Sequence, residues 1–243
     1  FSHFVSLGNE ADVTETDLIE YLGDDPRTSV IAAYVEQIRD GRRFLEVARR
    51  VSRQKPIVLI KAGRSDAGAR AVSSHTGSLA GTHAAYQAAF AQAGIIEVQN
   101  FNELFDVAIA FDFQPLPAGG RAAIFTNAGG PAALASDSLA AHGLNLADLN
   151  SQTRSDLRAF LNPAAQVGNP VDMLGSASPE EYRRSMQVVL QDPAVDIALP
   201  LLVPQAVVDT AGVAQAIVDA KAGSGKPVLA CIMGDKSVGQ ARL

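Results

Sequence analysis

The sequence predicts an α/β protein with two domains in tandem, each a doubly wound parallel sheet with helices on both faces. Along the whole chain, short apolar runs typical of buried strands alternate with amphipathic runs typical of helices. The alternation restarts after residues 115–120, a Pro/Gly cluster with the composition of a linker. We therefore predict a flavodoxin-like domain over residues 1–117 and a second one, truncated at its C-terminus, over residues 118–243.

In the first domain, hydrophobic periodicity and helix start and stop signals predict four strands and four helices. Thr14 and Asp17 have the spacing of a capping box, and Pro26 stops the helix that they start. Gly94 ends an alanine-rich helix that opens at Gly77. The strands are expected at residues 1–6, 29–35, 56–60 and 95–98, and the other two helices at residues 41–54 and from residue 100.

In the second domain the same signals predict three strands and three helices. One helix has a complete start, with Ser178 as the cap, Pro179 in the first turn and Glu181 as the reciprocal acid. The strands are expected at residues 122–126, 197–203 and 227–232, and the helices at residues 131–142, from residue 178 and at residues 209–222.

The composition of the 243-residue chain excludes several classes of protein. The net charge is −6 and the charges are interleaved, so no nucleic-acid surface is predicted. No apolar run approaches the roughly 18 residues of a membrane span, and nothing resembles a signal peptide. The single cysteine, Cys231, excludes an internal disulfide and is expected in the core. Together these features predict a cytoplasmic protein.

The stretch that is most informative about function is residues 73–81, which read Ser-Ser-His-Thr-Gly-Ser-Leu-Ala-Gly. They follow a predicted strand and a polar loop, and they open the alanine-rich helix. The first N–H groups of a helix lack intrahelical partners and bind anions. A histidine at that place, His75, suggests a side chain that carries a phosphoryl group. The spacing alone equally allows a His75 that only fills a helix N-terminal position.

A second helix start has the same pattern as the first. Thr126-Asn127-Ala128-Gly129 and Ser74-His75-Thr76-Gly77 each precede a small-residue helix that ends in glycine. If the two domains pack face to face, both helix N-termini point at one anion, and each supplies about half a positive charge. Such a pair would hold a phosphate without an arginine.

Glu36 is the carboxylate that we expect beside His75. It ends a predicted strand, and ligands of doubly wound sheets collect at the carboxyl ends of strands. If Glu36 accepts the proton of one imidazole nitrogen, the other nitrogen is free to attack. The alternative is a surface ion pair of Glu36 with Arg39 or Arg42.

The remaining polar candidates have weaker patterns. Lys61 and Arg64 follow a predicted strand and are candidates to screen the phosphate; as lone basic residues in a loop they are rather expected to be solvated. The other histidines lack the carboxylate and small-residue context of His75; they are His3, His83 and His142. No spacing typical of metal ligands is present, so no metal site is expected in this chain.

Together these motifs resemble those of ADP-forming (NDP-forming) acetyl-CoA and acyl-CoA synthetases, relatives of succinyl-CoA synthetase. The matching stretches follow one another in order over nearly the whole chain, which makes the resemblance more specific than any single motif. They are residues 4–12 (FVSLGNEAD), 34–44 (YVEQIRDGRRF), 61–65 (KAGRS), 74–81 (SHTGSLAG), 126–131 (TNAGGP) and 168–173 (GNPVDM).

The resemblance implies that His75 is the phosphorylated histidine, that Glu36 steadies it, and that two helix starts bind the phosphate. The phosphate-binding residues are then Thr76, Gly77, Ser78, Asn127, Ala128, Gly129 and Gly130. The resemblance also places Asn169 and Asp172 near the active site as candidate substrate-binding residues. Asn-Pro is an ordinary turn former as well, and both interpretations of Asn169 stay open.

By the same resemblance, the chain is the phosphoryl-relay portion of an acid–thiol ligase. The ligase would interconvert acyl-CoA, ADP and phosphate with a small carboxylic acid, ATP and CoA through a phosphohistidine and an acyl phosphate. CoA, the nucleotide and Mg²⁺ would be bound mainly by a CoA-binding domain and an ATP-grasp domain, on the same chain or on partner subunits. An oligomer is expected, and the chain is expected to be inactive alone. The alternative is a regulatory, ligand-sensing region of a protein lysine acetyltransferase.

Overall fold

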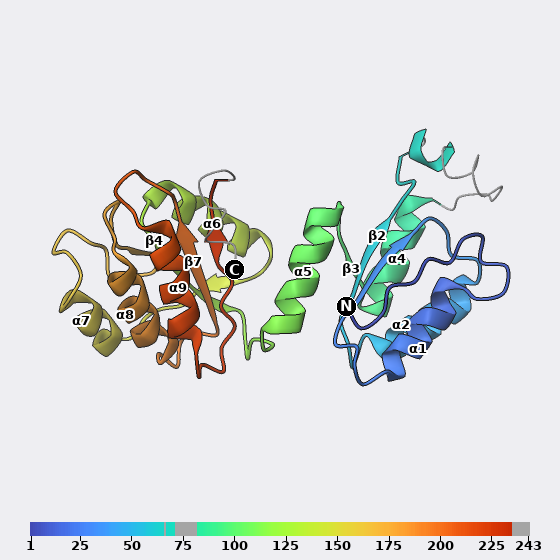
Figure 1. Cartoon of the computed structure of the whole chain (residues 1–243), viewed down its shortest axis with the longest axis horizontal. Coiled ribbons are helices and arrows are strands. Elements are labelled where there is room, and N and C mark those ends of the chain that lie inside the picture. The colour runs from blue at the N-terminus through green and yellow to red at the C-terminus, as the bar shows by residue number, and fades with distance from the viewer. Residues whose placement is uncertain (66, 71–81, 235–243) are drawn as a thin grey trace. The chain divides into compact units, whose positions relative to one another are not determined.

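The computed structural model describes residues 1–65, 67–70 and 82–234 and divides the chain into two compact units (Figure 1). The first unit is Phe1–Phe113 and the second is Gln114–Leu243. The division falls at the end of a helix, just before the Pro/Gly cluster. Within the described residues, no helix is both long and apolar enough to cross a membrane.

The first unit contains a parallel sheet of order β1-β2-β3 between two layers of helices (Figure 1). Alternate residues of β2 point to opposite faces of this sheet. Ile57 and Leu59 pack against α1, α2 and α4, whereas Val58 and Ile60 pack against α5. The elements are α1 (Glu15–Asp24), β1 (Ile31–Val35), α2 (Gly41–Val51), β2 (Ile57–Lys61), α4 (His83–Ala93), β3 (Ile96–Glu97) and α5 (Phe101–Phe113).

The strand predicted at the start of the first unit is wrong. Residues 1–6 do not form a strand, and Phe1 and Phe4 are exposed, because this segment does not pair with the free edge of β1. Helix α4 begins at His83, directly after the extended backbone of Thr82 (φ −65°, ψ 141°), and the predicted helix start at Gly77 lies outside the described residues. The predicted end of this helix is confirmed, since Gly94 adopts the left-handed conformation (φ 69°) that glycine tolerates best.

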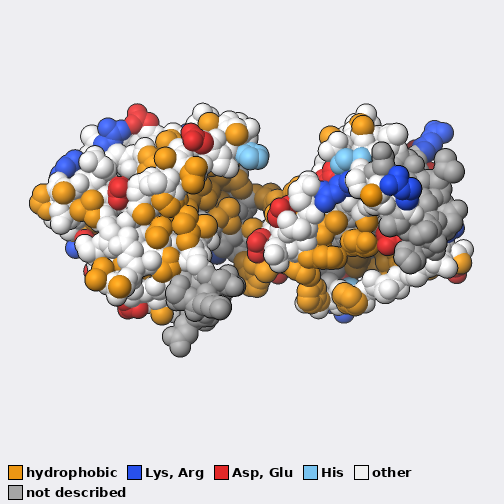
Figure 2. All heavy atoms as spheres, turned by 90° about the horizontal axis from the view of Figure 1, so that it is seen from above, with side chains coloured by type: hydrophobic (Ala, Val, Ile, Leu, Met, Phe, Trp, Pro, Cys, Tyr) orange, Lys and Arg blue, Asp and Glu red, His pale blue; other side chains and the backbone are white. Residues whose placement is uncertain are grey.

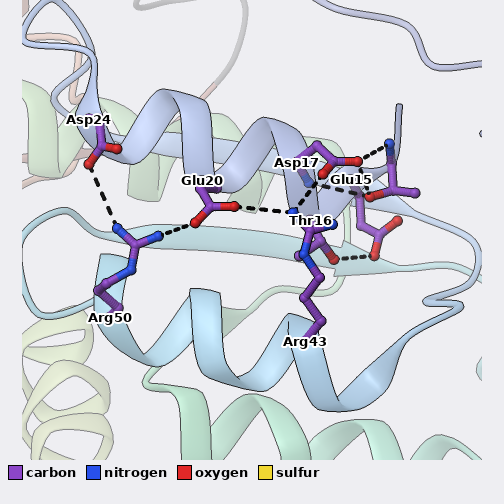
Figure 3. Close-up of polar contacts among 8 residues, drawn as sticks. Glu15, Thr16, Asp17, Glu20, Asp24, Arg43 and Arg50 are labelled. Atoms are coloured by element: carbon purple, nitrogen blue, oxygen red, sulfur yellow. Dashed lines mark hydrogen bonds and ion pairs between the residues drawn. The ribbon is translucent and has the colours of Figure 1, made fainter. Parts of the chain in front are cut away.

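Ion pairs link α1 to α2 along their exposed sides (Figure 3). The predicted capping box is confirmed, and its Asp17 also lies 2.6 Å from the guanidinium of Arg43. Glu20 bridges Arg43 (3.1 Å) and Arg50 (2.6 Å). Exposed pairs of this kind add little stability. The packing of the two helices against the sheet comes from their buried apolar faces.

α5 carries a second apolar face that the sheet does not cover. Phe101, Phe105 and Ile109 recur at every fourth residue and are each more than 40% exposed. Tyr34 of β1 stacks on the Phe101 ring, so this surface continues onto the edge of the sheet. Figure 2 shows exposed hydrophobic side chains on the visible faces of both units. Apolar surfaces of this kind are typical of contact regions.

The second unit contains a five-stranded parallel sheet of order β5-β4-β7-β8, in which β6 also pairs with β4. Ala123 and Phe125 of β4 pack against α7, α8 and α9, whereas Ala122 and Ile124 pack against α6. Both units thus confirm the predicted doubly wound parallel sheets. The elements are β4 (Arg121–Thr126), α6 (Gly129–Ala141), β5 (Asn145–Leu146), α7 (Ser151–Arg158), β6 (Val171–Asp172), α8 (Pro179–Leu190), β7 (Ile197–Leu202), α9 (Thr210–Lys221) and β8 (Cys231–Ile232).

Cys231 is exposed, so its expected place in the core is wrong. It lies in β8, a two-residue strand that pairs only with β7 in the described part of the chain. An edge strand of that length has few neighbours to bury its side chains.

The carboxylate of Asp196 ties the start of β4 to the start of β7. It accepts hydrogen bonds from the backbone N–H of Arg121 (2.9 Å) and from the Arg121 guanidinium (2.8 Å). Gly119 lies against the same carboxylate, since a Cβ there would come within 2.6 Å of Oδ2. These hydrogen bonds lower the pKa of Asp196 from its ordinary 3.8 to about 2, and the bond from the guanidinium has the largest effect.

We expect the second unit to lose stability as the pH falls from about 4 to about 2. A carboxylate with a lower pKa in the folded than in the unfolded protein stabilises the fold above its unfolded pKa, and protonation removes that contribution. Urea unfolding at neutral pH and within this acid range should show a larger loss for the wild type than for Asp196→Asn. Equal losses in the two proteins would contradict the prediction.

Candidate active site

Three strands of the first unit end in charged residues at one edge of the sheet. Glu36 directly follows β1, Lys61 is the last residue of β2, and Glu97 is the last residue of β3. The strands are parallel and Val35 pairs with Lys61, so these ends meet at the carboxyl edge. This is the edge at which doubly wound sheets collect ligands.

The carboxylate of Glu36 has a weak hydrogen-bond contact among the described residues. The hydroxyl of Tyr34 lies 3.5 Å from its Oε1, at the limit of a hydrogen bond. Arg39 instead donates to the carbonyl of Asn9 (2.8 Å), and Arg42 lies 3.7 Å from Glu46. The alternative ion pair of Glu36 with Arg39 or Arg42 is therefore not formed within the described residues.

Lys61 is only 2% exposed, so the expectation that it is solvated is wrong. Its ammonium donates to the backbone carbonyl of Glu36 (2.7 Å). Burial lowers the pKa of Lys61, and the negative charges of Glu36 and Glu97 partly oppose that shift. Arg64 is not simply solvated either, because its guanidinium donates to the backbone carbonyl of Gln99 (2.7 Å). The only sequence feature that could have indicated the contact between Lys61 and Glu36 is the place of Lys61 directly after an apolar run.

Two of the other histidines do have carboxylate neighbours, which the sequence did not reveal. Nε2 of His83 lies 3.8 Å from Oε1 of Glu97, and Nδ1 of His3 lies 3.4 Å from Oδ2 of Asp25. Each pair joins residues far apart in the chain, so only the tertiary fold brings them together.

The predicted nucleophile and its phosphate-binding turn lie outside the described residues. These are His75, Thr76, Gly77 and Ser78. The described chain resumes at Thr82, directly before α4. Of the predicted catalytic residues in the first unit, Glu36 is therefore the one whose surroundings the structure describes.

In the second unit, the start of α6 is open to a ligand. No side chain caps this helix, and Gly129 and Gly130 in its first turn are exposed. The backbone N–H of Ala128 donates to the hydroxyl of Thr126 (3.0 Å), which shapes the turn. The side chain of Asn127 is buried and bonded in both directions to the backbone of Val203 (2.8 and 2.9 Å).

Asp172 lies beside the same helix start. A Cβ on Gly129 would be 3.5 Å from its Oδ2, while its Oδ1 accepts the N–H of Leu174 (3.0 Å). The fold thus brings together Gly129 and Asp172, which are distant in the sequence. The Asp172 charge also contributes to raising the pKa of Tyr182, after the larger effect of burial.

Asn169 is engaged with the sheet. Its amide nitrogen donates to the carbonyls of Ala122 (2.7 Å) and Ala147 (2.9 Å), and its amide oxygen accepts the N–H of Ile124 (2.9 Å). β5 pairs with the beginning of β4 and β6 with its end, so Asn169 fills the space between them. These three bonds occupy the polar atoms of the side chain.

The two units, with their parallel sheets and polar carboxyl edges, define a fold class, the flavodoxin-like α/β domains. Residues 1–111 match the family described as "Succinyl-CoA ligase like flavodoxin domain", and residues 122–242 match the "Ligase-CoA domain". The chain belongs to the ADP-forming acyl-CoA synthetases, the relatives of succinyl-CoA synthetase.

Individual relatives agree with this assignment. The alpha subunit of acetate–CoA ligase (ADP-forming) II from Pyrococcus furiosus is 48% identical over 96% of this chain and 52% of its own length. Acetate–CoA ligase (ADP-forming) I from Archaeoglobus fulgidus is 45% identical over 99% of this chain and 34% of its own length. The chain therefore spans about half or less of the length of these relatives.

A solved structure supports the fold in the same way. It is that of the dinucleotide-forming acetyl-coenzyme A synthetase 1 from Ca. Korarchaeum cryptofilum, in complex with phosphate and ADP. It matches with a TM-score of 0.91 and 39% identity, over 98% of this chain and 52% of that chain.

Proposed function

We propose that the chain is the phosphoryl-relay portion of an ADP-forming acyl-CoA synthetase of the acetyl-CoA type. The complete protein would interconvert acyl-CoA, ADP and phosphate with a small carboxylic acid, ATP and CoA. The similarity over nearly the whole chain to relatives named acetate–CoA ligases carries this proposal. The same names favour it over a regulatory region of a protein lysine acetyltransferase.

In the proposed reaction, a neutral imidazole nitrogen of His75 attacks the γ-phosphorus of ATP, and ADP leaves. The phosphoryl group passes from His75 to an oxygen of the carboxylic acid, which gives an acyl phosphate. The CoA thiolate then attacks the carbonyl carbon, and phosphate leaves. A covalent carrier allows the nucleotide and CoA to be bound at separate places.

Glu36 is the proposed partner of His75. Two observations support this role: its place at the carboxyl end of β1, and a carboxylate whose described contact is the long one with Tyr34. Such a carboxylate can accept the N–H of an imidazole and orient the ring for attack.

The start of α6 is the proposed phosphate site of the second unit. An uncapped helix start attracts anions through its free N–H groups and its dipole. We assign the contact to the backbone of Ala128, Gly129 and Gly130, with Asn127 holding the turn through Val203. Thr76, Gly77 and Ser78 would supply the equivalent contact in the first unit.

Asp172 is a better candidate than Asn169 for contact with substrate. Its Oδ2 lies beside the start of α6, whereas the amide of Asn169 is used by the sheet. The negative charge of Asp172 would repel a phosphate bound at the start of α6. Asp172 could therefore control when the phosphate leaves.

CoA and the adenine nucleotide would be bound mainly by a CoA-binding domain and an ATP-grasp domain, fused to this chain or on partner subunits. The described residues include no cluster of three or more His, Cys, Asp or Glu side chains that could hold a metal. Mg²⁺ would be bound together with the nucleotide by the ATP-grasp domain.

The proposal is tested by incubating the full-length protein and any partner subunit with γ-labelled ATP and Mg²⁺. An acid-labile, alkali-stable label should appear on the peptide that contains His75. Adding a carboxylic acid together with CoA should remove that label. A protein that binds acyl-CoA but takes no label would overturn the relay and favour the regulatory alternative.

A further inference from the structure

Lys61 closes the carboxyl edge of the first sheet. Besides the carbonyl of Glu36 (2.7 Å), its ammonium donates to the carbonyl of Ala62, the residue that follows β2. The N–H of Ala62 in turn donates to the carbonyl of Val35 (2.9 Å). A buried lysine is rare unless its charge is compensated, and here these backbone carbonyls provide the hydrogen bonds.

The same ammonium also contacts a helix. It lies 4.5 Å from the centre of the Tyr86 ring, within reach of a cation–π interaction. Tyr86 belongs to the first half of α4, the helix that follows residues 73–81 in the sequence. Lys61 thus connects the end of β1, the end of β2 and the start of α4.

The contact between Lys61 and Glu36 involves the backbone of Glu36, not its carboxylate. A salt bridge from Lys61 would occupy the oxygens that Glu36 needs for an imidazole. The hydrogen bond to the carbonyl oxygen instead fixes the main chain of Glu36 and keeps a positive charge nearby. The carboxylate can then accept a hydrogen bond from another donor.

We propose that Lys61 is a positioning residue: its ammonium fixes the backbone at Glu36 and the start of α4, and so holds the Glu36 carboxylate at the carboxyl edge of the sheet. This inference rests on the proposed function for the roles of Glu36 and His75. The contacts that Lys61 makes are independent of that function.

Lys61→Met is the test variant, since methionine fills a similar volume without a donor or charge. Lys55→Met is the matched control, because Lys55 also donates to two backbone carbonyls of the first unit, those of Leu22 (3.0 Å) and Asp25 (2.5 Å). Neither carbonyl lies at the carboxyl edge of the sheet.

In the full-length protein, Lys61→Met should slow phosphorylation of His75 by about 10–100-fold with little change in KM for ATP. Glu36→Gln should slow it by about 100-fold. Because Lys61 acts through Glu36, the double variant should be no slower than Glu36→Gln alone. Multiplied effects in folded protein, or a wild-type rate for Lys61→Met, would overturn the proposal.

Amide hydrogen exchange gives a readout that does not need activity. Exchange at residues 35–38 should be faster in Lys61→Met and unchanged in Lys55→Met; unchanged exchange in Lys61→Met overturns the positioning role. If Lys61→Met does not fold, Lys61→Arg keeps the charge and donors and should retain slow exchange and most of the rate. If the wild type takes no label, the proposed function fails, and the exchange comparison still decides the role of Lys61.

Discussion

Replacing His75 by alanine is expected to abolish the acid-labile label and to lower acyl-CoA formation at least about 1,000-fold. The imidazole nitrogen is the proposed covalent carrier, and removing a nucleophile removes the intermediate on which both later steps depend. The measurement is ADP release from ATP by the full-length protein in the presence of a carboxylic acid and CoA, together with the labelling experiment.

His83→Ala is the matched control for this prediction. His83 is the first residue of α4 and lies 3.8 Å from Glu97, so it is a histidine beside a carboxylate in the same unit. We expect it to keep the label and most of the turnover. A label that survives in His75→Ala but is lost in His83→Ala would show that the relay is assigned to the wrong histidine.

Replacing Asn169 by alanine is expected to lower the free energy of unfolding of the second unit by about 3–5 kcal/mol. The substitution leaves the carbonyls of Ala122 and Ala147 and the N–H of Ile124 without partners. Each unpaired group in the protein interior costs roughly 1–3 kcal/mol, and partial access of water keeps the sum toward the lower end. Urea unfolding followed by circular dichroism measures the change.

Asn162→Ala is the control for Asn169. Asn162 is exposed and its side-chain oxygen accepts only a local bond from the N–H of Ala164 (2.9 Å), so its replacement should cost less than about 1 kcal/mol. If Asn169→Ala keeps wild-type stability and instead raises KM for the carboxylic acid, Asn169 binds substrate and its structural role is refuted.

Much of the fold could be predicted from the sequence because its signals are local. The capping boxes at Thr14 and Ser178 and the helix end at Gly94 are each set by residues within one turn of helix. The longer strands could be predicted because an apolar run of five or six residues, such as β7, has few alternatives to a buried position.

The short elements could not be predicted in the same way. β5 and β6 have two residues each, which is too few for a recognisable period, and both form only because β4 offers them an edge. The start of α4 shows the same limit. An alanine-rich sequence gives no local sign of the extended backbone at Thr82, directly before α4.

The candidate site divides along the same line. The sequence by itself predicts which residues could carry the chemistry, because Glu36 and the Asn127–Gly130 turn directly follow strands, where parallel sheets bind ligands. His75 lies outside the described residues, and its role stays a prediction. Only the tertiary structure decided which residues contact Glu36 and the start of α6. The register of β1 on β2 brings Lys61 to the carbonyl of Glu36, and the pairing of β6 with β4 brings Asp172 to the start of α6. Contacts between residues so far apart depend on strand pairing, which no local pattern contains.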